Sequence, residues 1–333
     1  MERLLGPATL RTGEVADAAV IEAPDPDWAE RIERMLRHKG DPWNWQNSEL
    51  LRRPCGLAAR FFILHRAGIP FSNIMLAEDA GVALLGHVWT EPADRGGGAS
   101  SLLMRAALDD FEGRGGRAIF LGTEFDSEPW RYYRRRGFEA VEPGSGYMAR
   151  YGESAEEFER AWFGGAQALV EPLDWTHWPA AAPLCLGGFP GLVRLAAGQL
   201  IGRISSEGAL LPLIRDARRR RESCQGGGPV VLRDAAGPAV LGIASRLPHP
   251  LWPDTDIVDL FCHPRWWPRA ADLLAAIPNA GARRAVAFAD AGEPARRAAL
   301  ESAGFRGIAV LPAWVRRAAS GAEMADVAML VRG

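Results

Sequence analysis

The sequence predicts an α/β (α+β) fold built as two tandem domains. The chain has 333 residues, which is enough for two domains of ordinary size. Apolar, strand-like stretches alternate with stretches of helical spacing in both halves, and their order in the first half recurs weakly in the second. A capping-box pattern at Ser154–Glu157 opens a helix over residues 153–164, which ends at Gly164-Gly165. We therefore expect the domains to span residues 1–164 and 165–333.

The elements of the first half follow from apolar spacing and turn residues. Trp28, Ile32 and Leu36 recur at every fourth position, which favours a helix over residues 27–38. Gly137 is placed to end a short helix as its C′ residue. The expected strands are 15–23, 58–65, 69–77, 82–90 and 117–123, with one or two more in 139–151, and the other expected helices are 41–53, 101–113 and 128–136.

The second half repeats this order. Residues 229–234 and 239–245 read as a hairpin around an Ala-Ala-Gly turn. The apolar strand 256–262 is followed by His263-Pro264, as strand 82–90 is followed by Glu91-Pro92. The remaining expected elements are a helix at 269–277, a strand at 284–289 and a helix at 293–303, after which Gly304-Phe305 stands where Gly137-Phe138 stood.

Composition narrows the class of protein. Hydrophobic residues make up 48% and charged residues 24%, as in globular domains, and the net charge of −2 favours neither nucleic acid nor a membrane surface. No stretch reaches the roughly 18 apolar residues of a membrane helix, and the first residues lack a signal-peptide core. The four cysteines have no CxxC or zinc-site spacing. We expect a cytoplasmic protein without a bound metal; its oligomeric state stays open.

The most informative stretch lies between strand 82–90 and helix 101–113. It reads Glu91-Pro92, then Arg95-Gly96-Gly97-Gly98-Ala99-Ser100. A glycine-rich turn between a strand and a helix presents backbone N–H groups to phosphate, and glycine lets a ligand approach the backbone closely. The stretch is neither a P-loop, because no Lys-Ser/Thr follows the glycines, nor a Gly-x-Gly-x-x-Gly dinucleotide fingerprint.

Two motifs resemble the GNAT superfamily of N-acetyltransferases. Residues 95–100 resemble its Arg/Gln-x-x-Gly-x-Gly/Ala pyrophosphate loop, with Ser100 as the departure, and Thr90-Glu91-Pro92 resembles the Val-x-Pro end of its central strand. About thirty residues on, residues 132–138 resemble its Tyr-x-x-x-Gly-Phe signature. The resemblance implies a mixed, mostly antiparallel central sheet flanked by helices. It also implies transfer of an acetyl group from acetyl-CoA to a small-molecule amine by direct attack in a ternary complex.

The resemblance also implies which residues bind acetyl-CoA. The pyrophosphate would lie on Arg95, Gly96, Gly97, Gly98, Ala99, Ser100 and Ser101. The main chain of Val88, Trp89 and Thr90 would pair with the pantetheine arm and polarise the thioester carbonyl, where this strand splays from the next. Asp126 stands where many relatives carry an Asn that contacts the arm. No metal takes part.

The candidate catalytic residues are Tyr133, His87 and Glu91. Tyr133, four residues before Gly137, would donate a proton to the leaving thiolate, with Tyr132 as its competitor. His87 is a candidate base, because imidazole titrates near neutral pH and because Leu85, His87, Trp89 and Glu91 alternate on one face of the strand. Glu91, Glu124 and a bound water are the alternatives. The aromatic residues that would line the acceptor site are Trp43, Trp45, Trp130 and Tyr132.

The second half lacks these motifs. Arg265-Trp266-Trp267-Pro268 replaces the glycine loop, and Leu300 replaces the tyrosine. We expect this half to bind no CoA and to serve structure or to shape the acceptor site. Other functions stay open: an acyl-CoA sensor or scaffold, transfer to a protein N-terminus or lysine, or thioester decarboxylation.

Overall fold

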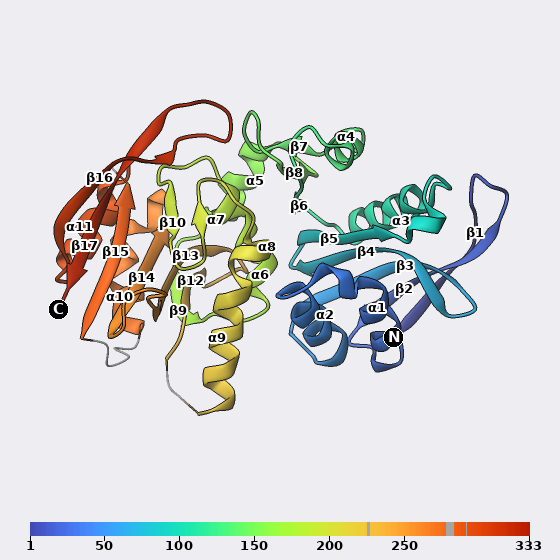
Figure 1. Cartoon of the computed structure of the whole chain (residues 1–333), viewed down its shortest axis with the longest axis horizontal. Coiled ribbons are helices and arrows are strands. Elements are labelled where there is room, and N and C mark those ends of the chain that lie inside the picture. The colour runs from blue at the N-terminus through green and yellow to red at the C-terminus, as the bar shows by residue number, and fades with distance from the viewer. Residues whose placement is uncertain (225–226, 278–282, 291) are drawn as a thin grey trace. The chain divides into compact units, whose positions relative to one another are not determined.

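The computed structural model describes residues 1–224, 227–277, 283–290 and 292–333. It divides into two compact units (Figure 1). The first unit comprises Met1–Leu121 with Tyr151–Glu153, and the second comprises Gly122–Arg150 with Ser154–Gly333. This division groups residues 122–150 with the second unit, so the domain limits 1–164 and 165–333 stay a prediction. None of the described helices is both long and apolar enough to span a membrane.

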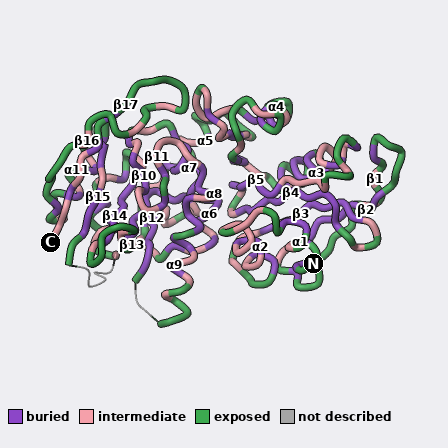
Figure 2. The backbone as a smooth tube through the Cα atoms, in the orientation of Figure 1, coloured by how far each residue is buried: buried purple, intermediate pink, exposed green. Residues whose placement is uncertain are grey.

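The first unit is built on a mostly antiparallel sheet. Its strands are β1 (Glu2–Thr9), β2 (Val15–Ala23), β3 (Ala58–Arg66), β4 (Ile69–Asp79), β5 (Val82–Thr90) and β6 (Ala118–Gly122). They lie in this order, and each neighbouring pair is antiparallel except β5 and β6, which run parallel. Figure 2 shows β3, β4 and β5 as largely buried, so the core of the unit lies around them.

Helices cover both faces of this sheet, with α1 (Pro26–Leu36) and α2 (Trp43–Arg52) on one side and α3 (Ala99–Gly113) on the other (Figure 1). The Asp25 side chain accepts hydrogen bonds from the N–H groups of Asp27 and Trp28, which caps α1 at its start. Helix α1 buries the predicted apolar stripe, Trp28, Ile32 and Leu36. Because both faces are covered, the central strands are apolar along nearly their whole length.

The second unit begins with the segment that carries the predicted Tyr-x-x-x-Gly-Phe signature. It contains α4 (Glu128–Arg134), β7 (Glu139–Ala140), β8 (Tyr147–Tyr151) and α5 (Ala155–Trp162). Gly137 has φ of +81°, as expected of the residue that ends a helix. The capping box between Ser154 and Glu157 is confirmed in both directions. The buried faces of Phe158 and Trp162 hold α5 in place.

A seven-stranded sheet forms the body of the second unit, in the order β16-β17-β15-β14-β13-β12-β9. Its strands are β9 (Ala168–Pro172), β12 (Val230–Asp234), β13 (Val240–Pro248), β14 (Thr255–Cys262), β15 (Arg284–Asp290), β16 (Arg306–Arg316) and β17 (Met324–Arg332). Only β14 and β15 pair in parallel. The predicted fold class is confirmed: both sheets are mixed and mostly antiparallel, and helices flank them.

Shorter elements complete the second unit. They are α6 (His177–Ala180), α7 (Ala182–Leu186), β10 (Val193–Leu195), β11 (Leu200–Ile201), α8 (Ser206–Ala209), α9 (Leu211–Glu222), α10 (Ala270–Ala276) and α11 (Pro294–Ser302). The predicted helix at 269–277 is confirmed as α10, and a 3₁₀ helix at Pro264–Arg269 precedes it.

Candidate functional site

The glycine-rich turn joins β5 to α3 in the first unit. After a short 3₁₀ turn at Pro92–Asp94, Gly98 takes φ of +85° and is the N-cap of α3, which begins at Ala99, two residues before the predicted start. Side chains rarely adopt this left-handed backbone, so glycine is required here. The first-turn N–H groups of a helix have no acceptor within it, and the helix dipole makes this end positive. The turn is therefore suited to bind an anion.

Two arginines border the turn. The backbone N–H of Arg11, in the turn between β1 and β2, donates to the Gly97 carbonyl at 2.9 Å. Its side chain lies 3.3 Å from where a Cβ on Gly98 would be. Arg95 donates from Nε to the Thr90 carbonyl at 3.1 Å. Arg11 could not be predicted from the sequence, because no local pattern links it to a loop more than 80 residues further along the chain.

An ion-pair network fixes the turn to the sheet. Arg66, on β3, donates to Asp94 at 2.7 Å and to Glu14 at 2.5 Å. These two carboxylates raise the pKa of Arg66, so its charge persists at any physiological pH. Asp94 lies one residue before Arg95, so the network holds the entrance of the glycine turn.

Strand β5 contains a bulge directly before its end. Asn73 of β4 pairs with Trp89, whereas Met75 pairs with Gly86, so His87 and Val88 together oppose Ile74. His87 accordingly has φ of +51°, and its carbonyl accepts a hydrogen bond from Asn73 Nδ2 at 2.9 Å. The predicted alternation of Leu85, His87, Trp89 and Glu91 on one face is therefore wrong, because the extra residue shifts the alternation.

The bulge lies beyond the last residue of β5 that pairs with β6. The two strands pair over Val82–Leu84 and Ala118–Phe120, while β5 continues to Thr90. This divergence is the splay that the resemblance implies. Some of the predicted pairing groups, Val88, Trp89 and Thr90, already have partners: the Trp89 carbonyl accepts from Ser72 Oγ at 3.2 Å, and the Thr90 carbonyl accepts from Arg95.

His87 is a buried, neutral histidine. It is 6% exposed, and its Nε2 lies 2.6 Å from Gln46 Oε1 of α2. Burial, reinforced by the nearby charges of Lys39 and His38, lowers the pKa of His87 to about 3. The expectation that it titrates near neutral pH is therefore wrong, although a part in the reaction stays a prediction. Gln46 was missed, since only the fold brings α2 to β5.

Aromatic rings surround this end of β5. The Trp43 ring contacts the His87 ring edge-on, with centroids 5.9 Å apart. The Trp89 ring contacts the His38 ring, with centroids 3.8 Å apart, and the Arg95 guanidinium, 4.7 Å from the Trp89 centroid. Trp45 is half-buried on the same helix as Trp43. Glu91 lies just beyond the strand, half-buried, and donates its N–H to the Phe71 carbonyl at 2.8 Å.

Tyr133 lies on α4 in the second unit. It is 7% exposed, and its ring contacts Tyr132 at 5.4 Å and Phe138 at 5.8 Å. Burial is the largest of the effects that raise the pKa of Tyr133, so the phenol keeps its proton, as a proton donor must. The ring of Tyr132 instead lies under the Arg136 guanidinium, 3.4 Å from its centroid.

The other predicted residues of the second unit have structural partners. Asp126 is exposed, has φ of +55° and pairs with Arg131 at 2.9 Å. Trp130 is buried, and its indole N–H donates to the Ser145 carbonyl at 3.2 Å. Glu124 is exposed, and its carbonyl accepts from Ser127 Oγ at 2.6 Å. Roles for these residues stay predictions.

The matching position of the second unit is filled by the chain itself. Strands β14 and β15 pair over Thr255–Ile257 and Arg284–Val286, and β10 contacts both strands. Asp290 accepts the N–H groups of Leu192 and Val193 at 2.7 and 3.1 Å. Asp259 of β14 accepts those of Ala196 and Ala197 at 2.6 and 2.9 Å. Two carboxylates thus hold residues 192–197 against the diverging strands.

No protein-family model matches the sequence, and no curated protein matches it. Solved structures do. One is an acetyltransferase of the GNAT family from Staphylococcus aureus Mu50, with 15% identity and a TM-score of 0.34, covering 41% of this chain and 99% of that one. An N-acetyltransferase from the same source has 14% identity and a TM-score of 0.38, covering 50% and 98%. A GNAT family N-acetyltransferase from Escherichia coli in complex with CoA has 18% identity and a TM-score of 0.34, covering 40% and 81%.

Proposed function

We propose that the first unit binds acetyl-CoA and that the protein transfers its acetyl group to the amine of a small molecule. One observation carries the proposal. A left-handed glycine turn at the start of α3, bordered by Arg11 and Arg95, directly follows a bulged strand that has diverged from its parallel neighbour. The turn can hold a pyrophosphate, and the divergence leaves room for an extended arm beside β5.

The reaction that we propose is a single displacement at the thioester carbonyl. The amine nitrogen attacks the carbonyl carbon, the carbon–sulfur bond breaks, and the thiolate takes a proton from Tyr133. The amine proton passes to a base. This role for Tyr133 rests on the Tyr-x-x-x-Gly-Phe resemblance of residues 132–138, and the phenol keeps its proton, as a donor must. Main-chain N–H groups at Val88–Thr90 would polarise the carbonyl as negative charge develops on its oxygen.

The environment of His87 narrows the choice of base. An imidazole with a pKa of about 3 is too weak to take a proton from an alkylammonium ion. We therefore assign His87 to hydrogen bonding in its neutral form, held by Gln46 at 2.6 Å. Glu91 and a bound water are left as proton acceptors. Trp43 and Trp89, beside His87 and Lys39, favour an acceptor with an apolar body.

The experiment that tests the proposal follows free thiol released from acetyl-CoA by the purified chain, with and without a panel of small amines and short peptides. Thiol that appears only with a small amine supports the transferase. Thiol that appears only with peptides would identify a protein N-terminus or lysine as the acceptor. Thiol that appears without any acceptor would indicate hydrolysis or decarboxylation. CoA binding without thiol release would contradict transfer and support the sensor.

A further inference from the structure

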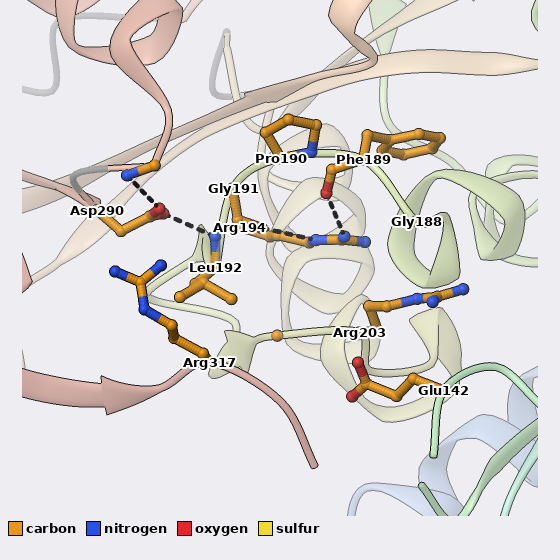
Figure 3. A pocket seen from close by; sticks show the side chains of 12 residues that line it. Glu142, Gly188, Phe189, Pro190, Gly191, Leu192, Arg194, Arg203, Asp290 and Arg317 are labelled. Carbon is orange, nitrogen blue, oxygen red and sulfur yellow. Dashed lines mark hydrogen bonds between the residues drawn. The ribbon is translucent and has the colours of Figure 1, made fainter. Parts of the chain in front are cut away.

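The second unit contains a pocket that the proposed reaction does not use (Figure 3). Its volume is about 390 Å³, which is enough for a small organic molecule. The walls come from the loop at residues 188–192, from residues 202–203, from the end of β15 at Asp290 and from the β16–β17 hairpin at Arg317. Its charged lining residues are Glu142, Arg194, Arg203, Asp290 and Arg317.

Arg194 is a buried cation whose hydrogen bonds within the described residues all end on uncharged groups. It is 1% exposed. Every hydrogen bond that its guanidinium makes within the described residues ends on a backbone carbonyl, those of Leu184, Cys185, Gly187, Phe189 and Gly191. Burial lowers the pKa of Arg194 to about 10, which still leaves it charged at neutral pH. A buried charge without a bonded counter-ion is costly, so the field of Arg194 favours an anion in the pocket.

A second arginine adds to this field. Arg203 donates from Nε to the Leu186 carbonyl at 2.7 Å, and its charge also depresses the pKa of Arg194. The two pocket carboxylates, Glu142 and Asp290, raise the pKa of Arg194 and offset this field only partly, because three arginines line the pocket. Asp290 already accepts the N–H groups of Leu192, Val193 and Gly292, and Glu142 accepts the N–H of Ala319 at 3.2 Å.

The cationic groups are spread around the pocket. In Figure 3, the guanidinium groups of Arg203 and Arg317 lie well apart, with Leu192 between them. Arg317 extends from the exposed hairpin and pairs with Glu323 at 2.9 Å, a partner that a ligand can replace because such surface pairs are weak. Arg203 and Arg317 belong to different walls of the pocket, so a ligand with two acidic groups can contact both.

We propose that this pocket binds a small organic molecule with two separated acidic groups, carboxylate or phosphate, one held by Arg203 and the other by Arg317. Arginine binds both oxyanions through paired, charge-assisted hydrogen bonds. Arg194 contributes its charge from the pocket lining without leaving its carbonyl partners. The pocket belongs to the unit that lacks the glycine loop, so this site is independent of acyl-CoA binding.

Calorimetric titration of the full chain tests the proposal with three probes: glutarate, 3-phosphoglycerate and acetate. We expect both two-headed anions to bind at least tenfold more tightly than acetate. The tighter of the two identifies carboxylate or phosphate as the preferred second group. Equal binding of acetate and both two-headed probes would overturn the proposal, as would no binding at millimolar concentration.

Substitutions of the lining residues test whether glutarate binds in this pocket. R203Q and R317Q should each weaken glutarate binding about tenfold or more. R221Q, at an exposed arginine of α9 that pairs with Asp174, is the matched control and should change nothing. E142Q removes a negative charge from the pocket and should strengthen binding. Weaker binding in E142Q, or an equal loss in R221Q, would overturn the assignment. Since Arg317 is exposed, R317Q keeps the test valid even if R203Q fails to fold.

Discussion

Strands β5 and β14 stand at the same place in their sheets, each with an antiparallel neighbour on one side and a parallel neighbour on the other. In both sheets the parallel pairing covers three residue pairs before the strands diverge. Beyond that point the two units differ. A glycine turn and a bulge follow in the first, whereas in the second Asp259 and Asp290 anchor residues 192–197 against the diverging strands.

This comparison shows two different arrangements at the point where a pair of parallel strands diverges. An open divergence of two strands leaves backbone groups that must be satisfied by water or by a ligand. In the second unit, four N–H groups of the inserted segment reach two carboxylates, and Trp266, 6% exposed, is part of the segment that replaces the glycine turn. The space is thus occupied permanently by the chain, which stabilises the sheet without any cofactor.

The largest expected effect comes from breaking the glycine turn. G98D places a side chain at φ of +85° and adds a negative charge beside the expected pyrophosphate and Arg11. We expect CoA binding to be lost, by several kcal/mol, and the calorimetric stoichiometry to fall from one per chain to zero. G6D is the control, because Gly6 has φ of +93° with nothing near its Cβ position. A folded G98D variant that binds CoA at one per chain with unchanged affinity would contradict the proposed pyrophosphate site.

Tyr133 gives the next largest effect, on turnover. Y133F keeps the ring against Phe138 but removes the proton donor, so kcat should fall by roughly 10²–10⁴-fold while CoA affinity stays nearly unchanged. Y132F is the control, because the ring of Tyr132 lies under Arg136. Steady-state and binding measurements on both variants separate the roles. If Y132F alone loses activity, the wrong tyrosine was chosen, and full activity in both variants would mean that the proton comes from elsewhere.

The sequence predicted what depends on local spacing, and it missed what depends on tertiary packing. The glycine turn, the helix that it starts and the glycine that ends α4 were all predicted, because each depends on a few consecutive residues. The bulge at His87 was not, since it depends on the register between β4 and β5. Strands β1 and β16 were not predicted, and both are largely exposed (Figure 2), although β16 carries the apolar residues Ile308, Val310 and Trp314. Arg11 and Gln46 come from segments distant in sequence.

The pH dependence of the free energy of unfolding allows one histidine of each unit to be compared. The pKa of His87 is lower in the folded chain than its ordinary 6.5. The unfolded chain therefore binds more protons between pH 6.5 and about 3, and the free energy of unfolding falls as the pH falls through this window. Between pH 7.5 and 5 the wild type should lose about 2 kcal/mol more than H87Q, as urea unfolding at several pH values can measure.

The second unit provides the control for this measurement. His263 stacks on Phe163 with centroids 4.3 Å apart, and partial burial lowers its pKa to about 4. Because His263 is only half-buried, solvent reduces the penalty for charging it, and H263Q should remove less of the acid sensitivity than H87Q does. An effect of H263Q equal to or larger than that of H87Q would contradict the assigned environment of His87.

The smallest expected effect sharpens the comparison between the two turns. Arg11 borders the glycine turn of the first unit, whereas Arg265 stands in the segment that replaces that turn in the second, where it donates to the Gly164 carbonyl at 3.2 Å. Arg11 is exposed, so a contact with the CoA phosphates is worth only about 1 kcal/mol, and R11Q should weaken CoA binding by roughly 5- to 10-fold. The loss should shrink as salt is raised, because salt screens exposed charges. R265Q should leave CoA affinity unchanged at every salt concentration. An equal loss in R265Q would mean that both turns contribute to CoA binding. It would contradict the proposal that only the first unit binds CoA.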